Sequence, residues 1–263
     1  MVSCLLVTLP VPQRLAYLKR SVAAYCRQTH RDAELVIVVD PGPAGARAAI
    51  VDHIAGLGRD DIRIVESPER RPLGALRNLS VASARGDFLC QWDDDDLHHP
   101  QRVERQRSAL IESGKQAVLL EEVMQFFPRS RKLYCINWRA TEDKGNPGTL
   151  MCKRSAPIRY PETGSEARRG EDSAVVRQLQ HQDGVHILKG APHLYVYVSH
   201  GDNTFPDDHH RMLAAELSIS QALLRRREAH LRDGLRPFDF GPGEVTVEGY
   251  NGTAFTIAAA PGS

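Results

Sequence analysis

The stretch LGALRNLSVASARGDFLCQWDDDD, residues 73–96, carries the pattern that decides the fold. Residues 73–85 are mostly small and apolar and predict a helix, and the apolar residues 87–92 predict a strand. That strand ends directly on four consecutive aspartates, Asp93 to Asp96. A helix followed by an apolar strand that ends in a polar turn is one unit of a sheet covered by helices.

The residues on either side of this unit repeat the same alternation. Strands are predicted at residues 3–8, 35–39 and 62–65, and helices after Pro12, around residues 50–57 and after Pro100. The strand at residues 35–39 is β-branched and shows no polar alternation, as expected of a strand buried on both faces. The order of the elements predicts an α/β fold with a mostly parallel, Rossmann-like sheet flanked by helices.

The second half of the chain is less regular. The predicted elements are strands at 117–127, 131–138, 148–153, 185–188 and 194–199, a loop at 157–170 and a helix from Glu171. One long helix is then expected, because Leu213, Leu217 and Leu224 fall on a single helical face. Residues 245–250 and 253–258 flank Asn251-Gly252, a pair typical of a tight hairpin turn.

Composition and charge exclude several classes of protein. The 263 residues include 34 Lys and Arg against 33 Asp and Glu, so the net charge of +1 argues against a general nucleic-acid binder. No apolar run approaches the roughly 18 residues of a transmembrane helix, and the first residues do not resemble a secretory signal. Five widely spaced cysteines fit neither a disulfide framework nor a zinc site. We therefore expect a cytoplasmic location.

Several predicted strands end on polar residues at the edge of the sheet where ligands of open α/β folds bind. The second strand leads to Asp40, and the strand described above leads to the aspartate tetrad, by which we mean Asp93 to Asp96. Carboxylates about 4 Å apart repel by roughly 4 kcal/mol at an effective dielectric constant of about 20. The tetrad therefore indicates a hard divalent cation, Mg²⁺ or Mn²⁺. The alternative is a solvated turn in which Asp96 caps the following helix.

Two further motifs carry candidate chemistry. Glu171 and Asp172 follow Gly170 at the start of a predicted helix, where acidic side chains either stabilise the helix dipole or supply a general base beside a metal. His200 follows a late strand and precedes a glycine. It is either a loop histidine or a nitrogen ligand, and a nitrogen ligand would favour Mn²⁺ over Mg²⁺.

Motifs of several other enzyme classes are missing from the sequence. It has no GxxxxGK[ST] phosphate loop, no GxGxxG after the first strand, no HExxH and no GxSxG. The pairs His98-His99 and His209-His210 are expected at the surface, because adjacent side chains rarely point at one ion. The basic run at residues 225–227 is expected on an exposed helix face, which leaves a weak contact with acidic lipid headgroups open.

Taken together, these pieces resemble family 2 glycosyltransferases of the GT-A fold. The resemblance rests on residues 2–10, on 34–42 (ELVIVVDPG), on 73–96 with Pro100 behind them, and on residues 170–172, which are similar to the family's ED motif. It implies an inverting enzyme of the hexosyltransferase class that uses a nucleoside-diphosphate sugar and a divalent metal, Mn²⁺ or Mg²⁺. It also implies a smaller acceptor-side sheet beside the main one, with a C-terminal helix plus β-hairpin.

The resemblance implies where the nucleotide of the donor binds. Asp40 would contact the base, Thr8 and Pro10 would line the same pocket, and Arg77 would lie nearby. The family often has two acidic residues after the second strand, whereas Pro41 follows Asp40 here.

The tetrad would supply the contacts with the ribose, the diphosphate and the metal. Asp93 and Asp94 would face the ribose or the diphosphate, and Asp95 would bind the metal. His200 would touch the metal or the diphosphate. Four consecutive aspartates leave the register of the family's DxD motif ambiguous by one residue.

The catalytic and acceptor roles fall in the second half of the chain. Asp172 would be the catalytic base, with Glu171 beside it in the ED motif. Trp138 would stack on the acceptor sugar or simply pack against its neighbours. The acceptor would be a saccharide or a lipid-linked saccharide, and no nucleic-acid partner is expected.

We expect a single GT-A domain at residues 1–234. It would comprise a nucleotide-sugar-binding half at 1–115, an acceptor and catalytic half at 116–205, and a C-terminal helix at 206–234. A tail with the hairpin would follow at 235–263. Two other functions stay open on the sequence alone: a metal-dependent nucleotidyltransferase on a similar sheet, and a glycosyltransferase-like binding protein without catalysis.

Overall fold

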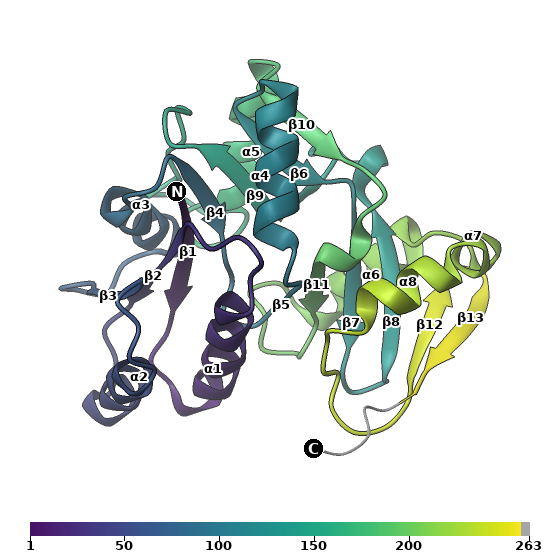
Figure 1. The fold of residues 1–263 in the computed structure, drawn as a ribbon, viewed down its shortest axis with the longest axis horizontal. Helices are drawn as coiled ribbons and strands as arrows, with labels where there is room; N and C mark the ends of the chain where they lie inside the picture. The colour runs from purple at the N-terminus through teal and green to yellow at the C-terminus, as the bar shows by residue number, and fades with distance from the viewer. Residues whose placement is uncertain (259–263) are drawn as a thin grey trace.

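A computed structural model describes residues 1–258, so the end of the expected tail, residues 259–263, lies outside the described residues. The larger sheet has seven strands in the order β10-β6-β9-β4-β1-β2-β3 (Figure 1). Within it β9 runs antiparallel to β4 and β6, and the other neighbours are parallel. The strands are β1 (Val2–Thr8), β2 (Ala33–Val39), β3 (Ile62–Glu66), β4 (Phe88–Gln91), β6 (Ala117–Leu120), β9 (Asn146–Lys153) and β10 (Val185–Leu188). The mostly parallel sheet expected from the sequence is confirmed.

Helices cover both faces of this sheet. On one face lie α1 (Pro12–Cys26), α2 (Ala44–Gly56) and α4 (Arg102–Ser113), and on the other lie α3 (Leu73–Ser83) and α5 (Glu171–His181). Alternate residues of β2 divide between the two layers, because Leu35 and Ile37 join the first core and Val36 the second. All three side chains are fully buried, which explains the unbroken apolar run of this strand.

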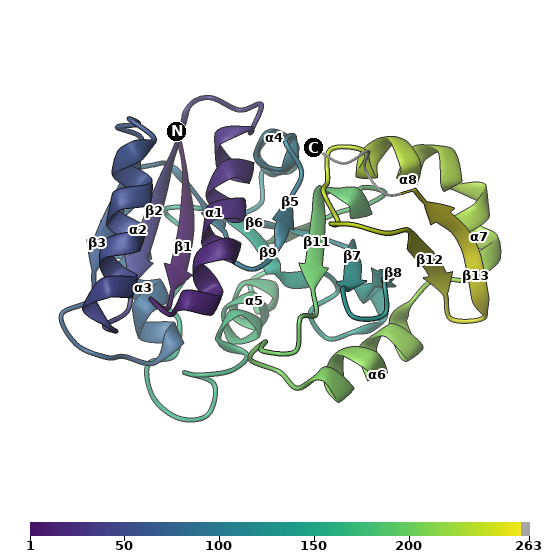
Figure 2. The same cartoon turned by 90° about the horizontal axis from the view of Figure 1, so that it is seen from below.

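A second sheet of six strands stands beside the first, in the order β13-β12-β8-β7-β11-β5 (Figure 2). Its strands are β5 (Leu97–His98), β7 (Glu122–Phe127), β8 (Lys132–Asn137), β11 (Tyr195–Val198), β12 (Val245–Gly249) and β13 (Gly252–Ile257). The single strand expected at residues 117–127 is wrong, because the chain leaves the first sheet at Leu120 and enters the second at Glu122. The change of sheet falls at Glu121-Glu122, two charged residues between the apolar stretches 117–120 and 123–127, which the prediction of one strand overlooked.

The long C-terminal helix expected from the leucine spacing is also wrong. The segment forms three helices, α6 (Asp207–Leu217), α7 (Gln221–Arg226) and α8 (Glu228–Leu235). Ser218 breaks the helix by pairing with Ile136, and the side chain of Ser220 caps α7. The leucines pack on opposite faces of the second sheet. Leu217 belongs to the core under α6, and Leu224 belongs to the core under α7 and α8.

The expected hairpin is confirmed as β12 and β13. Parallel pairing of β12 with β8 makes it part of the second sheet. Two short 3-10 helices, η1 (Trp138–Ala140) and η2 (Pro192–Leu194), complete the elements near the junction of the sheets. Within residues 1–258, none of the helices combines the length and the apolar character that a membrane span requires.

Candidate active site

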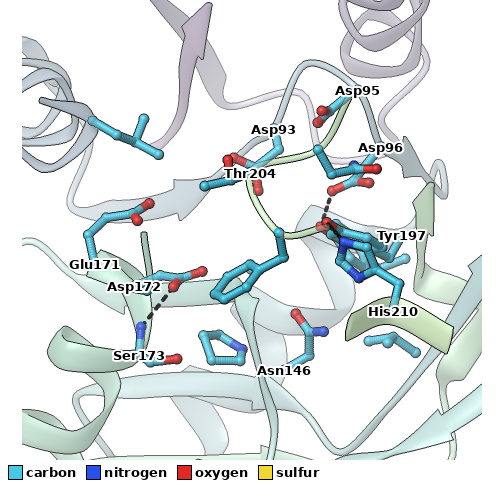
Figure 3. Close-up of a pocket in the computed structure, with 18 of the residues that line it drawn as sticks. Asp93, Asp95, Asp96, Asn146, Glu171, Asp172, Ser173, Tyr197, Thr204 and His210 are labelled. Atoms are coloured by element: carbon cyan, nitrogen blue, oxygen red, sulfur yellow. Dashed lines mark hydrogen bonds between the residues drawn. The ribbon is translucent and has the colours of Figure 1, made fainter. Parts of the chain in front are cut away.

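A cavity of about 370 Å³ opens where the carboxyl edge of the larger sheet meets the second sheet (Figure 3). Residues from β1, β7, β11, α5 and α6 reach its wall. The tetrad forms one side, and the start of α5 forms another (Figure 3). The ionisable groups of the wall are six carboxyl groups, two guanidinium groups, two imidazoles and two phenols, those of Asp93, Asp94, Asp95, Asp96, Glu171, Asp172, Arg14, Arg77, His209, His210, Tyr195 and Tyr197.

Arginines neutralise much of the tetrad, which the repulsion argument from the sequence did not foresee. Arg14, in the first turn of α1, donates to both oxygens of Asp94, and its Nη2 lies 3.0 Å from Oδ2 of Asp95. The hydroxyl of Thr8 donates to Oδ2 of Asp94 over 2.5 Å. Arg14 sits two residues after Pro12, at the edge where the strands end, and this position is the signal that could have identified it.

Asp95 and Asp96 have different surroundings. Asp95 lies 3.0 Å from Nε2 of His200, and this hydrogen bond and the Arg14 charge hold the pKa of Asp95 at about 2 against the cost of burial. Asp96 accepts hydrogen bonds from the backbone N–H of Val198 at 2.8 Å and from the hydroxyl of Tyr195. Burial raises the pKa of Asp96 well above its usual range. Asp96 therefore joins the tetrad to β11 of the second sheet.

A buried arginine supports the tetrad from behind. Arg102 of α4 is fully buried, and its guanidinium lies over the rings of Trp92 and Tyr195 at 5.4 and 4.9 Å. Its Nη1 lies 2.5 Å from Nδ1 of His98, whose Nε2 is 3.0 Å from the carbonyl oxygen of Asp93. Since the guanidinium only donates, His98 accepts at Nδ1 and donates from Nε2. This chain of contacts orients the backbone of the tetrad.

The expectation of surface histidines is wrong for three of the four. His98, His99 and His210 are buried, at 2%, 6% and 4% exposure, and His209 is partly exposed. Each adjacent pair divides between different neighbours, since His98 stacks on Trp92 while His99 contacts His193. Aromatic packing, rather than shared metal binding, accounts for these histidines.

Arg77 of α3 bridges the tetrad and the ED pair. Its Nη2 lies 3.0 Å from Oδ1 of Asp93, and its Nε lies 2.7 Å from Oε1 of Glu171. These side chains come from three separate parts of the chain and line one cavity, and Figure 3 shows two of them, Asp93 and Glu171. The structure thus brings Asp93 and the Glu171-Asp172 pair together, as the resemblance implies.

Among the described residues, Asp172 is the carboxylate of this group that forms no ion pair. Gly170 adopts a left-handed φ of 77°, which glycine does without steric cost, and turns the chain into the first turn of α5. Oδ1 of Asp172 accepts from the N–H of Ser173 at 2.8 Å (Figure 3). Burial, followed by the neighbouring charge of Glu171, raises the pKa of Asp172 to about 7. Such a carboxylate is suited to accept a proton near neutral pH.

Thr8, Pro10, Asp40 and His200 lie outside the cavity wall itself. Thr8 is hydrogen-bonded to Asp94 and His200 to Asp95, and these two aspartates line the cavity. Asp40 is buried at the end of β2, where its backbone N–H donates to Thr8 and its Oδ2 lies 3.6 Å from Arg70. Its Oδ1 is buried and accepts no hydrogen bond from any described residue. Pro10 contacts the turn at Gly42 next to Asp40.

On the side of the second sheet, Trp138 lies in the cavity wall, as expected of an acceptor residue. The sequence did not indicate its companions there. Tyr197 and His210 meet at 3.3 Å between the hydroxyl and Nε2, and Phe205 stacks on His209 with ring centres 4.6 Å apart. Loop and helix residues of this kind leave no motif in a single sequence.

The donor atoms of Asp95 and His200 suit a divalent cation. Within residues 1–258, no group of three or more His, Cys, Asp and Glu side chains is placed to hold a metal alone. A carboxylate oxygen and an imidazole nitrogen 3.0 Å apart nevertheless match the preferences of Mn²⁺. Mg²⁺ and similar ions are commonly held by one or two protein ligands together with substrate phosphates. The residues present therefore fit a cation that arrives with a diphosphate.

The family model for glycosyl transferase family 2 matches residues 7–152, more than half of the chain. The chain belongs to this family. Among curated relatives, the uncharacterized glycosyltransferase MJ1057 of Methanocaldococcus jannaschii is 34% identical over 109 residues. That match covers 40% of this chain and 36% of the relative, so the chain aligns with about a third of the relative's length.

Solved structures of glycosyltransferases share the fold of this family member. TarS of S. aureus in complex with UDP-GlcNAc is similar in structure, with a TM-score of 0.57 and 13% sequence identity. The match covers 90% of this chain and 71% of the TarS chain. Mannosyltransferase PcManGT from Pyrobaculum calidifontis in complex with GDP-Man and Mn²⁺ matches 88% and 64%, with a TM-score of 0.59 and 17% identity. The GT-A fold and the family expected from the sequence are both confirmed.

Proposed function

We propose that the protein transfers a sugar from a nucleoside-diphosphate sugar to an acceptor hydroxyl with inversion at the anomeric carbon. The observation that carries this proposal is the Arg77 bridge, which holds Asp93 and the Glu171-Asp172 pair in one cavity wall. Family membership and the donors named with TarS and PcManGT support the same conclusion.

The donor would bind along the carboxyl edge of β1, β2 and β4. The unpartnered Oδ1 of Asp40 accepts an N–H of the base, with Thr8 and Pro10 around it. Asp93 and Asp94 face the ribose or the diphosphate, and Arg77 holds Asp93 in place. Asp95 and His200 hold Mn²⁺ or Mg²⁺. When bound, the cation stabilises the negative charge that develops on the departing diphosphate.

Asp172 would act as the base. It removes the proton of the acceptor hydroxyl, whose oxygen forms a bond to the anomeric carbon from the face opposite the diphosphate. The bond between that carbon and the diphosphate oxygen breaks at the same time, and its electron pair leaves with the diphosphate. One displacement inverts the anomeric configuration. The raised pKa of Asp172 supports this role, because a base near pKa 7 both ionises and accepts a proton at neutral pH.

A donor panel tests the proposal. UDP-GlcNAc, UDP-glucose, GDP-mannose and dTDP-glucose are each incubated with the full chain, with and without Mn²⁺, and release of the nucleoside diphosphate is measured. We expect metal-dependent release from one donor and its loss in Asp95→Asn. Met212→Ala serves as a control, since Met212 is exposed on α6. Absence of metal-dependent release or nucleotide binding across the panel would contradict the proposal, and release of pyrophosphate from a nucleoside triphosphate would favour a nucleotidyltransferase.

A further inference from the structure

The cavity wall on the side of the second sheet mixes apolar side chains with neutral polar ones, which include those of Gln125, Asn203 and Thr204. Val123 of β7, Trp138 of η1 and Leu213 of α6 contribute side chains to it, together with Phe205 from the loop before α6. Figure 3 shows Tyr197 and His210 on this side, across the cavity from Glu171 and Asp172. A molecule that presents a hydroxyl to Asp172 therefore rests its other parts against apolar and aromatic groups.

This wall offers no free positive charge among the described residues. The guanidinium groups that line the cavity as a whole are those of Arg14 and Arg77. Both lie on the side of the larger sheet and are bound to carboxylates of the cavity. The two histidines of the wall are neutral at pH 7, because burial lowers the pKa of His209 and lowers that of His210 to about 4. Arg169 lies near Phe205, 5.2 Å from the ring centre, but outside the wall. An anionic group inside the wall would face Glu171 and Asp172, and the nearby cation, the exposed Arg169 beside Phe205, lies outside it.

Tyr197 and His210 provide a fixed polar contact within the apolar wall. Their hydroxyl and Nε2 atoms are 3.3 Å apart, their ring centres are 5.0 Å apart, and His210 is buried. Neutral groups of this kind hydrogen-bond to sugar hydroxyls, since each both donates and accepts. The wall thus combines neutral polar side chains with an apolar surface made by Val123, Trp138, Phe205 and Leu213.

We propose that the acceptor is uncharged and amphipathic, a glycoside whose apolar aglycone packs against Trp138, Phe205 and Leu213. This inference rests on the proposed function, because it assigns the substrate class of the same site. It disfavours sugar phosphates and uronic acids as acceptors. Phe205 and Leu213 are the specificity-determining residues of the apolar part.

Binding of matched sugars tests the inference without requiring catalysis. The hexyl glycoside, methyl glycoside and 1-phosphate of glucose, galactose, mannose and N-acetylglucosamine are titrated into the full chain while tryptophan fluorescence is recorded. The chain has two tryptophans, and Trp92 is fully buried, so a change reports on Trp138 and disappears in Trp138→Phe. We expect the hexyl glycoside of at least one sugar to bind about tenfold more tightly than its methyl counterpart, and the 1-phosphate to bind most weakly.

Variants of the wall complete the test. Phe205→Ala and Leu213→Ala should each weaken hexyl glycoside binding by roughly fivefold and leave nucleotide binding unchanged. Met212→Ala, on the exposed side of the same helix, should change neither. Equal binding of hexyl and methyl glycosides, stronger binding of the 1-phosphate, or no response to any hexyl glycoside overturns the inference. Selective hexyl glycoside binding without transfer from any donor would instead contradict the proposed function alone.

Discussion

The two sides of the cavity are built on different physical principles. On the side of the larger sheet, oppositely charged side chains form ion pairs. Arg14 and Arg77 each contact two carboxylates. On the side of the second sheet, the cavity is lined by aromatic, aliphatic and neutral polar side chains, among them the hydrogen-bonded pair Tyr197 and His210. On the proposed function, the charged side takes the donor together with a cation, and the neutral side takes the acceptor. Asp172 lies where the two sides meet.

The largest effect is expected from breaking the Arg77 bridge. Arg77→Met leaves the buried Glu171 and the partly exposed Asp93 without their counter-charge, which should lower the free energy of unfolding by about 3–5 kcal/mol. Urea unfolding followed by circular dichroism measures this loss. Arg71→Met removes the exposed ion pair with Glu69 and should cost less than about 1 kcal/mol. Equal losses in both variants would show that the bridge does not hold the charged side together.

The pH dependence of transfer tests the role of Asp172, which lies where the two sides of the cavity meet. Because Asp172 must be ionised to accept a proton and its pKa is raised to about 7, kcat/KM should rise about tenfold per pH unit below pH 7 and level off above it. A pH profile at fixed ionic strength checks this. The stability linkage has the opposite sign, since a raised pKa favours the protonated carboxyl. Its stabilising contribution is complete below the usual pKa of 3.8 and is lost as the pH rises through about 7.

A smaller effect is expected where the tetrad meets β11. Tyr195→Phe removes the hydroxyl that donates to Asp96 and leaves the ring in place, so the free energy of unfolding should fall by about 1–3 kcal/mol. Tyr250→Phe is the matched control, because Tyr250 is 64% exposed. Thermal melts of both variants provide the comparison. Indistinguishable melting temperatures would mean that this hydrogen bond does not link the sheets.

The larger sheet was predictable from the sequence for a physical reason. Its strands are short apolar runs, and each helix between them shows its own period, so element order alone defines the parallel sheet. The tetrad and Asp172 were predictable because acidic residues directly follow a buried strand or open a helix. The second sheet was harder, since two glutamates between apolar stretches mark the strand break and the leucines of residues 213–224 pack into two cores.

Long-range pairing explains what the sequence did not indicate in the site. Arg14 precedes its partner Asp94 by 80 residues, and Tyr195 follows Asp96 by 99. Neither partner can be identified from the residues next to it in the sequence. His210 was missed for a related reason, because its partner Tyr197 lies on another element, whereas His98 is buried by its near neighbours Trp92 and Arg102, whose packing around it the sequence pattern does not show.

Asp172→Asn tests most directly whether both sides serve one reaction. With the donor found in the panel and a glycoside acceptor, we expect transfer to fall by about a thousandfold or more, while nucleotide binding in thermal melts stays the same. Asp183→Asn provides the control, since Asp183 lies in the turn after α5 with its side chain 92% exposed. Transfer at the rate of the unmodified chain in Asp172→Asn would contradict the account.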